Sequence, residues 1–213
     1  MAEIQWQGKQ AGRTHRFLPR GEAVLAAADT VRVAAGEALA ILAADGALAG
    51  LLVGPAQSEV SALPFVAALG AQATFGRYPV ALLWVSTAPV EIKAEFPLPP
   101  IADPRTGMKC AGASARATFG LAVTDAAKLL AAQHTDAKPI AGDVVERLAK
   151  QALGTACATF WTESREAVAT RQAPMEEMAP KLAATVLDPV GLVVSGLKVE
   201  LRLPVGFTPR PGQ

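Results

Sequence analysis

The pattern of apolar and polar residues in the middle of the chain predicts three strands. Residues 78–87 are apolar at nearly every position, which is typical of a strand buried on both faces. Residues 90–96 alternate between apolar and charged residues, as a strand with one exposed face does. A proline-rich turn follows, in which we expect the carboxylate of Asp103 to hold neighbouring amides. Residues 116–123 alternate again and predict the third strand.

The first part of the chain has the same short period between turn residues. Residues 30–33, 37–42 and 47–53 are typical of strands, and the Asp45-Gly46 pair favours a tight turn between the last two. We expect an antiparallel meander here, followed by a short helix at residues 63–70.

The second half of the chain changes to a helical period. Residues 126–134 predict one helix, and apolar residues recur every three to four positions in a second helix that begins at Pro139. The helical pattern continues through residues 160–171 and again through residues 175–187. Strict alternation at residues 197–203 predicts a closing strand.

These elements predict the fold class and the domain organisation. Strands come first, helices follow and a last strand returns, so we predict an α+β domain with an N-terminal antiparallel meander, several helices and a closing C-terminal strand. We expect this domain to span residues 22–203, with a basic lead-in at residues 1–21 and a flexible tail rich in proline and glycine at residues 204–213. A length of 213 residues suits one such domain.

Composition narrows the classes of partner and compartment. The formal net charge is +1 and only 5% of the residues are aromatic, so we expect no binding of nucleic acid. The first residues lack the apolar run of a signal peptide, and we expect a cytoplasmic protein, with contact at the inner face of the membrane as a further option. Cys110 and Cys157 have no closely spaced cysteine partner and are expected to be free, buried thiols, with no role assigned to either.

Two interpretations stay open for the basic segment at residues 9–20, which contains no acidic residue. It is either a solvated lead-in with a strand attached, or an arm that contacts anionic lipid headgroups or another anion. In the second case the contacting residues are Trp6, Arg13, Arg16, Phe17 and Arg20.

No motif in the sequence predicts catalysis. The segment Gly112-Ala113-Ser114-Ala115-Arg116 lacks the second glycine of a nucleophile elbow, and no phosphate-binding loop is present. We expect His134 to cap the C-terminal end of a helix. A zinc site would require His15 or His134 to converge with the cysteines, and the paired spacing of such sites is missing. We therefore predict no enzymatic activity, no cofactor and no bound metal.

Several short segments form an ordered series from residue 4 to residue 203. They are Ile4-Gln5-Trp6, Arg16-Phe17-Leu18-Pro19, residues 31–42, Gly54-Pro55-Ala56, Leu63-Pro64-Phe65, residues 80–87, residues 96–103, residues 119–130 and residues 191–199. This series resembles bacterial members of the SPFH (Band 7; stomatin, prohibitin, flotillin) family, especially the virion-core-like subgroup. The family has glycine where this chain has Ala56, and a tyrosine where this chain has Gln57-Ser58.

The resemblance implies a non-enzymatic scaffold that associates with itself and organises other proteins, with peripheral membrane contact as a further expectation. The residues add two candidate self-association strands with rows of mixed charge, or else two ordinary solvated faces: Glu91, Lys93 and Glu95, and Lys198, Glu200 and Arg202. The alternatives are a small α+β enzyme or ligand-binding protein, with a pocket near Asp103, Lys109 or His134, and a structural component of a larger particle.

Overall fold

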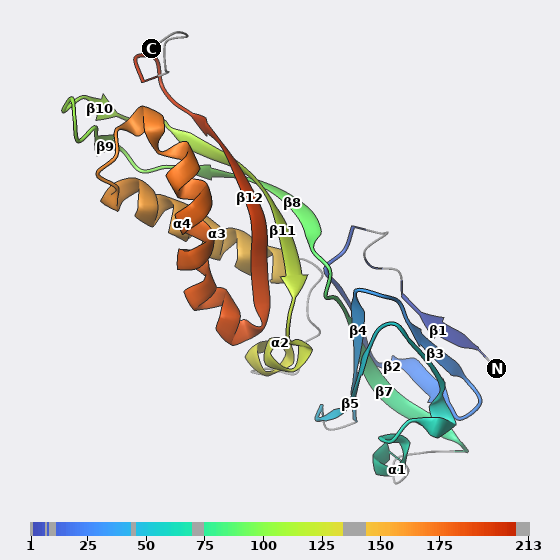
Figure 1. Ribbon diagram of the computed structural model, residues 1–213. Helices are drawn as coiled ribbons and strands as arrows, with labels where there is room; N and C mark the ends of the chain where they lie inside the picture. Colours follow the sequence, from blue (N-terminus) through green and yellow to red (C-terminus); the bar gives the residue numbers. More distant parts are fainter. Residues whose placement is uncertain are drawn as a thin grey trace. The chain divides into compact units, whose positions relative to one another are not determined.

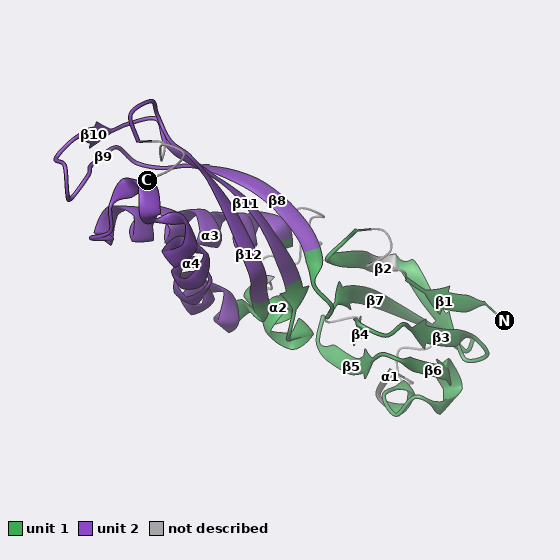
Figure 2. Ribbon diagram, turned by 45° about the horizontal axis from the view of Figure 1, so that its top comes forward, with its two compact units in different colours: residues 1–90, 122–145, 190–192 green, residues 91–121, 146–189, 193–213 purple. Residues whose placement is uncertain are grey.

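A computed structural model describes residues 2–6, 8, 12–43, 46–69, 75–133 and 144–207 (Figure 1). The protein is of mixed α+β class, as the hydrophobic pattern predicts, with strands, helices and a strand near its C-terminus. The chain divides into two compact units (Figure 2). Unit 1 consists of residues 1–90, 122–145 and 190–192, and unit 2 consists of residues 91–121, 146–189 and 193–213.

Unit 1 contains an antiparallel four-stranded sheet. Its order is β2 (His15–Ala26), β7 (Arg77–Ser86), β4 (Glu37–Leu42) and β5 (Leu48–Val53). The two central strands, β7 and β4, are buried along most or all of their length, which explains their nearly continuous apolar sequences. The strand β2 begins inside the basic segment, in agreement with the interpretation of that segment as a lead-in with a strand attached, and it runs across the boundary that the sequence places after residue 21.

A second sheet of unit 1 corrects the predicted meander. It has the order β1 (Glu3–Gln5), β3 (Thr30–Val33) and β6 (Ala56–Glu59), with β1 parallel to β3. The consecutive strands β3 and β4 therefore belong to different sheets, so the predicted meander is confirmed for the antiparallel pair β4–β5 and is wrong for β3. The reason is that alternation specifies a strand but not its partner.

The core of unit 1 lies between these two sheets and two short helical segments, η1 (Val60–Ala62) and α1 (Val66–Leu69). The helix α2 (Ala126–Gln133) also belongs to unit 1 and packs against β4. Asp125 caps α2, because its Oδ1 accepts the amides of Ala127 and Lys128 at 2.9 and 3.0 Å.

Unit 2 is built on a three-stranded sheet with the order β12 (Leu192–Arg202), β11 (Ser114–Val123) and β8 (Val90–Pro97). Neighbouring strands run in opposite directions, and the helices α3 (Val144–Glu163) and α4 (Gln172–Leu187) cover one face (Figure 1). The covered face carries buried apolar side chains, among them Ile92, Phe119 and Val199. The other face carries charged and polar side chains, which is the one-sided pattern that alternation predicts.

Small residues allow the helices of unit 2 to pack closely. A Cβ added at Gly154 of α3 would lie 3.0 Å from the Phe96 ring of β8, so a larger residue there would require the ring to move by a few tenths of an ångström. In α4, buried residues recur at helical spacing, although Pro180 lies inside the helix: Met175, Ala179, Ala183 and Leu187.

Connections of unit 2 differ from the sequence-based expectation at two places. The pattern at residues 160–171 predicts helix, but α3 ends at Glu163 and a single turn, η3 (Val168–Thr170), precedes α4. Within the proline-rich turn, β9 (Ile101–Ala102) and β10 (Lys109–Cys110) form a small hairpin. The helix start at Pro139, the cap at His134, the turn residue Asp45 and the last six tail residues lie outside the described part. After α4, the turn η4 (Asp188–Val190) leads into β12.

Candidate functional site

The structure brings both predicted charged rows onto one sheet. Glu91, Lys93 and Glu95 lie on β8, whereas Lys198, Glu200 and Arg202 lie on β12. These are the two edge strands of the sheet of unit 2, and β11 runs between them. All six residues are exposed, and they alternate with the buried residues of the helix-covered face, so they lie on the opposite face. We call this surface the charged face.

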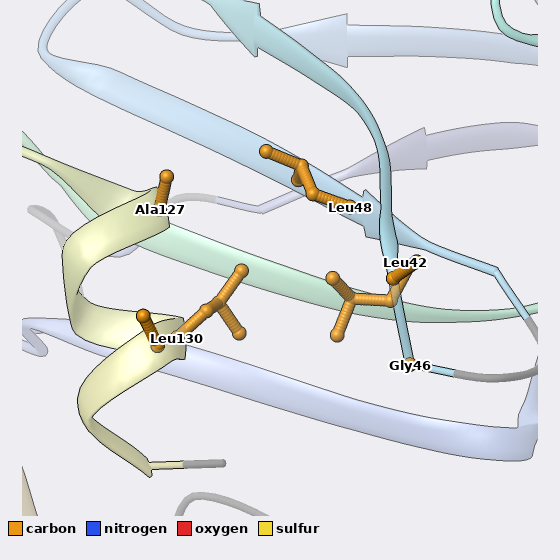
Figure 3. Close-up of a pocket in the computed structure, with 7 residues that line it drawn as sticks. Leu42, Gly46, Leu48, Ala127 and Leu130 are labelled. Carbon is orange, nitrogen blue, oxygen red and sulfur yellow. The ribbon is translucent and has the colours of Figure 1, made fainter.

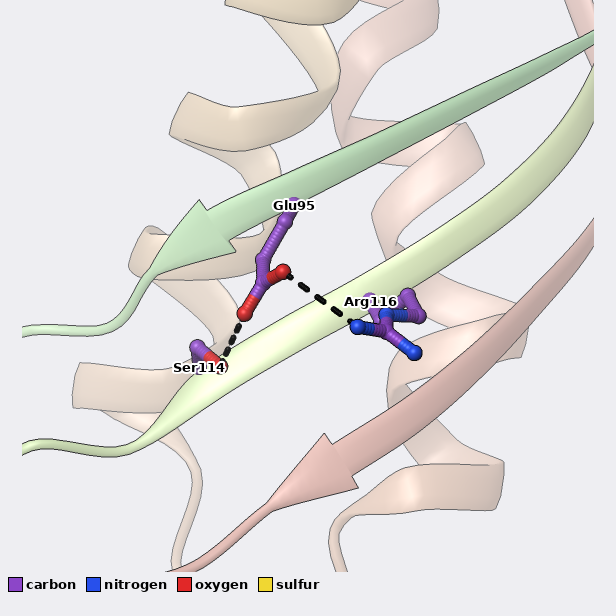
Figure 4. Close-up of polar contacts among 3 residues, drawn as sticks. All are labelled: Glu95, Ser114 and Arg116. Atoms are coloured by element: carbon purple, nitrogen blue, oxygen red, sulfur yellow. Dashed lines mark hydrogen bonds and ion pairs between the residues drawn. The ribbon is translucent and has the colours of Figure 1, made fainter.

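On the β8 side, the charged face is held by contacts to β11 (Figure 4). The Glu95 carboxylate accepts a hydrogen bond from the Ser114 hydroxyl at 3.0 Å and lies 3.8 Å from the Arg116 guanidinium. Along β8 itself, Lys93 Nζ lies 3.5 Å from Glu91 Oε1. Exposed ion pairs of this kind contribute about 0–1 kcal/mol each. They orient the side chains but do little to hold the fold together.

On the β12 side, a glycine sets which residues face outward. Gly196 has a φ of +59°, a conformation that favours glycine, and it resets the alternation within β12. From that point Leu197 and Val199 are buried while the charged residues between and after them are exposed. This break in the alternation therefore places Lys198, Glu200 and Arg202 together on the charged face.

The edge of β12 is partly covered by α4. Glu176 accepts the Val199 amide at 2.8 Å, and its second oxygen lies 3.6 Å from Lys198 Nζ. An amide bonded to α4 cannot also bond to β11, so this N–H points to the open edge of the sheet. Within the described residues, Glu200 and Arg202 have no ion-pair partner. No local signal in the sequence shows the contact of Glu176 with a strand.

A buried polar cluster supports the hairpin of unit 2. The carboxylate of Asp103 accepts the amides of Arg105 and Thr106 at 2.8 and 2.9 Å, as the proline-turn motif predicts. Its other oxygen accepts the amide of Val168, 65 residues away, at 2.8 Å. Burial opposes the charge, but the three backbone hydrogen bonds outweigh it and hold the pKa of Asp103 below its usual value. The carboxylate thus joins the hairpin to η3.

Arg171 completes this cluster from the start of α4. Its guanidinium is buried and donates to the carbonyls of Trp161, Ser164 and Glu166, which are left free where α3 ends. It also lies 5.0 Å from the centre of the Trp161 ring, a cation–π arrangement. Trp161 in turn donates to the carbonyl of Pro99 at 2.9 Å. Burial lowers the pKa of Arg171, and the charge of Asp103 opposes that shift.

The cluster is suited to structure and not to chemistry on a substrate. Asp103 is 4% exposed and Arg171 is 1% exposed, so neither presents its charge to solvent. The sequence identified Asp103 by its place in a proline turn, whereas Arg171 and Trp161 lie in a stretch expected to be helical and were missed. Both cysteines are free and buried, as predicted. Burial raises the pKa of Cys110, and it raises the pKa of Cys157 to about 12, so neither forms a reactive thiolate near neutral pH.

The residues proposed to contact a membrane or an anion have different surroundings. Trp6 is 6% exposed and packs against Trp84 with ring centroids 6.4 Å apart, which places it in the core instead of at an interface. Arg13 and Arg16 are exposed and Phe17 is half-buried.

The remaining member of that set is Arg20, whose side chain lies outside the described part. Near Trp6, the buried carboxylate of Glu37 accepts the Gly8 amide at 2.8 Å and so ties the N-terminal segment to β4.

Unit 1 contains a cavity of about 410 Å³ between α2 and the β4–β5 turn (Figure 3). Leu42, Leu48 and Leu130 point into it. The lining contains only glycine, alanine and leucine, so this cavity can accept an apolar group but supplies no acid, base or nucleophile.

Within the described ranges, no cluster of three or more histidine, cysteine, aspartate or glutamate residues is placed to hold a metal ion. No helix in the part of the chain that the structure describes has both the length and the apolar character needed to cross a bilayer. No protein-family model matches this chain, and no curated protein matches it either.

Proposed function

We propose that this protein is a non-enzymatic scaffold of SPFH (Band 7) type that associates with copies of itself and organises partner proteins. The observation that supports self-association is the charged face with its two edge strands. An edge strand has backbone groups with no partner in its own sheet, which favours the addition of another strand. The charges above each edge then influence which strand can be added.

The organisation of other proteins rests on the resemblance to the SPFH family. A scaffold requires surfaces and not a reaction centre, and the charged face is such a surface. Peripheral membrane contact stays a prediction. It depends on the exposed residues Arg13 and Arg16, because Trp6 is buried in the core.

The native mass of the purified chain tests the proposal. We expect size exclusion with light scattering to show oligomers whose mass exceeds the 22.0 kDa of one chain and grows with concentration. Raising the salt to about 1 M shortens the screening length to about 3 Å and should reduce the association if ionic contacts contribute. A monomer at every concentration and every salt would contradict the scaffold function.

A further inference from the structure

We propose that copies of this chain join head to tail, with β8 of one copy pairing with β12 of the next. This inference rests on the proposed self-association and states which two edges meet. It is drawn from the order of charges on the two edge strands, which the structure places at opposite edges of the same sheet.

The two rows are complementary at every position. Along β8 the exposed charges are negative, positive and negative, at Glu91, Lys93 and Glu95. Along β12 they are positive, negative and positive, at Lys198, Glu200 and Arg202. Residues of the same face recur every second position, so both rows have the same spacing and align pair by pair. Because β8 and β12 both run opposite to β11, joining them edge to edge with the helices on the same side of both sheets makes the two strands parallel, and the facing pairs Glu91–Lys198, Lys93–Glu200 and Glu95–Arg202 then all have opposite charge.

Pairing of an edge with its own copy lacks this complementarity. An antiparallel β8–β8 pair centred on Lys93 places that lysine against itself and Glu91 against Glu95, so all three pairs repel. The β12–β12 pair centred on Glu200 repels for the same reason. A shift of two residues restores only two opposite pairs. Like charges directly across two strands are destabilising, so the charge order favours β8 against β12.

The contact of Glu176 is the part of this edge that must change on pairing. Its carboxylate holds the Val199 amide at the open edge of β12, where a carbonyl of an incoming β8 would bind. On pairing, the Val199 amide exchanges the Glu176 carboxylate for that backbone carbonyl as its hydrogen-bond acceptor. Replacing Glu176 by alanine removes the intramolecular acceptor and should strengthen association, by about two- to tenfold for one hydrogen bond.

Contact between two different edges is heterologous, because each copy keeps one free β8 and one free β12. Such contacts do not end at a dimer. They form a closed ring where the rotation between copies allows closure, and an open filament where it does not.

Exchange of the charges between the two strands tests the pairing. One variant reverses β8 (E91K/K93E/E95K), a second reverses β12 (K198E/E200K/R202E), and a third carries all six changes. Between copies of either three-fold variant, all three facing pairs of β8 and β12 have like charges. We therefore expect association at least about tenfold weaker than in the natural chain. The six-fold variant restores all three opposite pairs and should associate like the natural chain.

The same set supplies its own control for folding. The six-fold variant contains every substitution of the other two and keeps the formal net charge of +1. A mixture of the two three-fold variants should also associate, because each has the row that the other requires. If the three-fold variants associate as well as the natural chain does, the pairing is wrong while self-association stands. If the natural chain is monomeric, the scaffold function and the pairing both fail.

Disulfide trapping gives a second readout that does not depend on charge. Lys93 and Glu200 are the middle residues of the two rows, so they face each other when the rows align. A mixture of K93C and E200C chains should form a mixed disulfide dimer, and a chain with both changes should form a ladder. Cys110 and Cys157 are buried and serve as the unreactive background. Absence of the mixed dimer in chains that still associate would overturn the pairing.

Discussion

The clearest quantitative prediction concerns Asp103, whose side chain joins two segments that are distant in the sequence. In an Asp103→Asn variant, one oxygen can still accept the amides of Arg105 and Thr106. The new NH₂ group then faces the amide of Val168, which is a donor and buried. A buried donor left without an acceptor costs about 1–3 kcal/mol, and hydrogen bonds to a charged acceptor are stronger than those to a neutral one. We therefore expect a loss of about 2–3 kcal/mol in the free energy of unfolding at pH 7.

The acid limb of the stability profile provides an independent check. The folded state holds the pKa of Asp103 below the usual 3.8, so the folded state binds its proton less readily than the unfolded state does. The contribution is then fully present above the unfolded pKa and is lost as the pH falls through the lower, folded pKa. The difference between the natural chain and the Asn variant should be constant from pH 7 to about pH 5 and should shrink below about pH 4.

The assay is urea unfolding followed by circular dichroism at a series of pH values from 7 to 3. Asp125→Asn is the matched control, because Asp125 also accepts two amides but is not buried and caps a helix. Asparagine caps helices as well as aspartate does, so we expect a change below about 0.5 kcal/mol in the control. If Asp103→Asn costs no more than the control, or if its cost stays the same at pH 3, the assigned role of this carboxylate is incorrect.

Two further predictions concern the cores of the units. Trp6→Ala removes a large buried ring and should lower the free energy of unfolding, measured in urea, by about 3 kcal/mol or more. Unchanged stability with reduced binding to anionic vesicles would instead support an interfacial role for Trp6. The two cysteines should not react with Ellman's reagent in the folded protein at pH 8, because both are buried and the pKa of Cys157 is raised to about 12. The denatured protein should give two reactive thiols per chain. Rapid reaction of one thiol in folded protein would contradict the burial of that residue.

Much of the secondary structure follows from local pattern. The continuous apolar run predicts β7, and the alternating runs predict β8, β11 and the end of β12. Apolar residues occupy every position of a strand buried on both faces and every second position of a strand buried on one face. The stretch at residues 160–171 was predicted as helix, but α3 ends at Glu163. Its charged residue Arg171 caps the free carbonyls at that end, a role that depends on where the chain turns and not on the period.

The candidate surface divides in the same way. The sequence by itself determines that Glu91, Lys93 and Glu95 share one face of a strand and that Lys198, Glu200 and Arg202 share one face of another, because side chains alternate along any strand. Only the tertiary structure decides that these two strands are the edges of a single sheet with β11 between them. It also decides that Asp103 reaches Val168 and that β3 and β4 separate into different sheets. Such contacts join residues far apart in the chain, and they depend on which packed arrangement buries the most apolar surface, which no local pattern records.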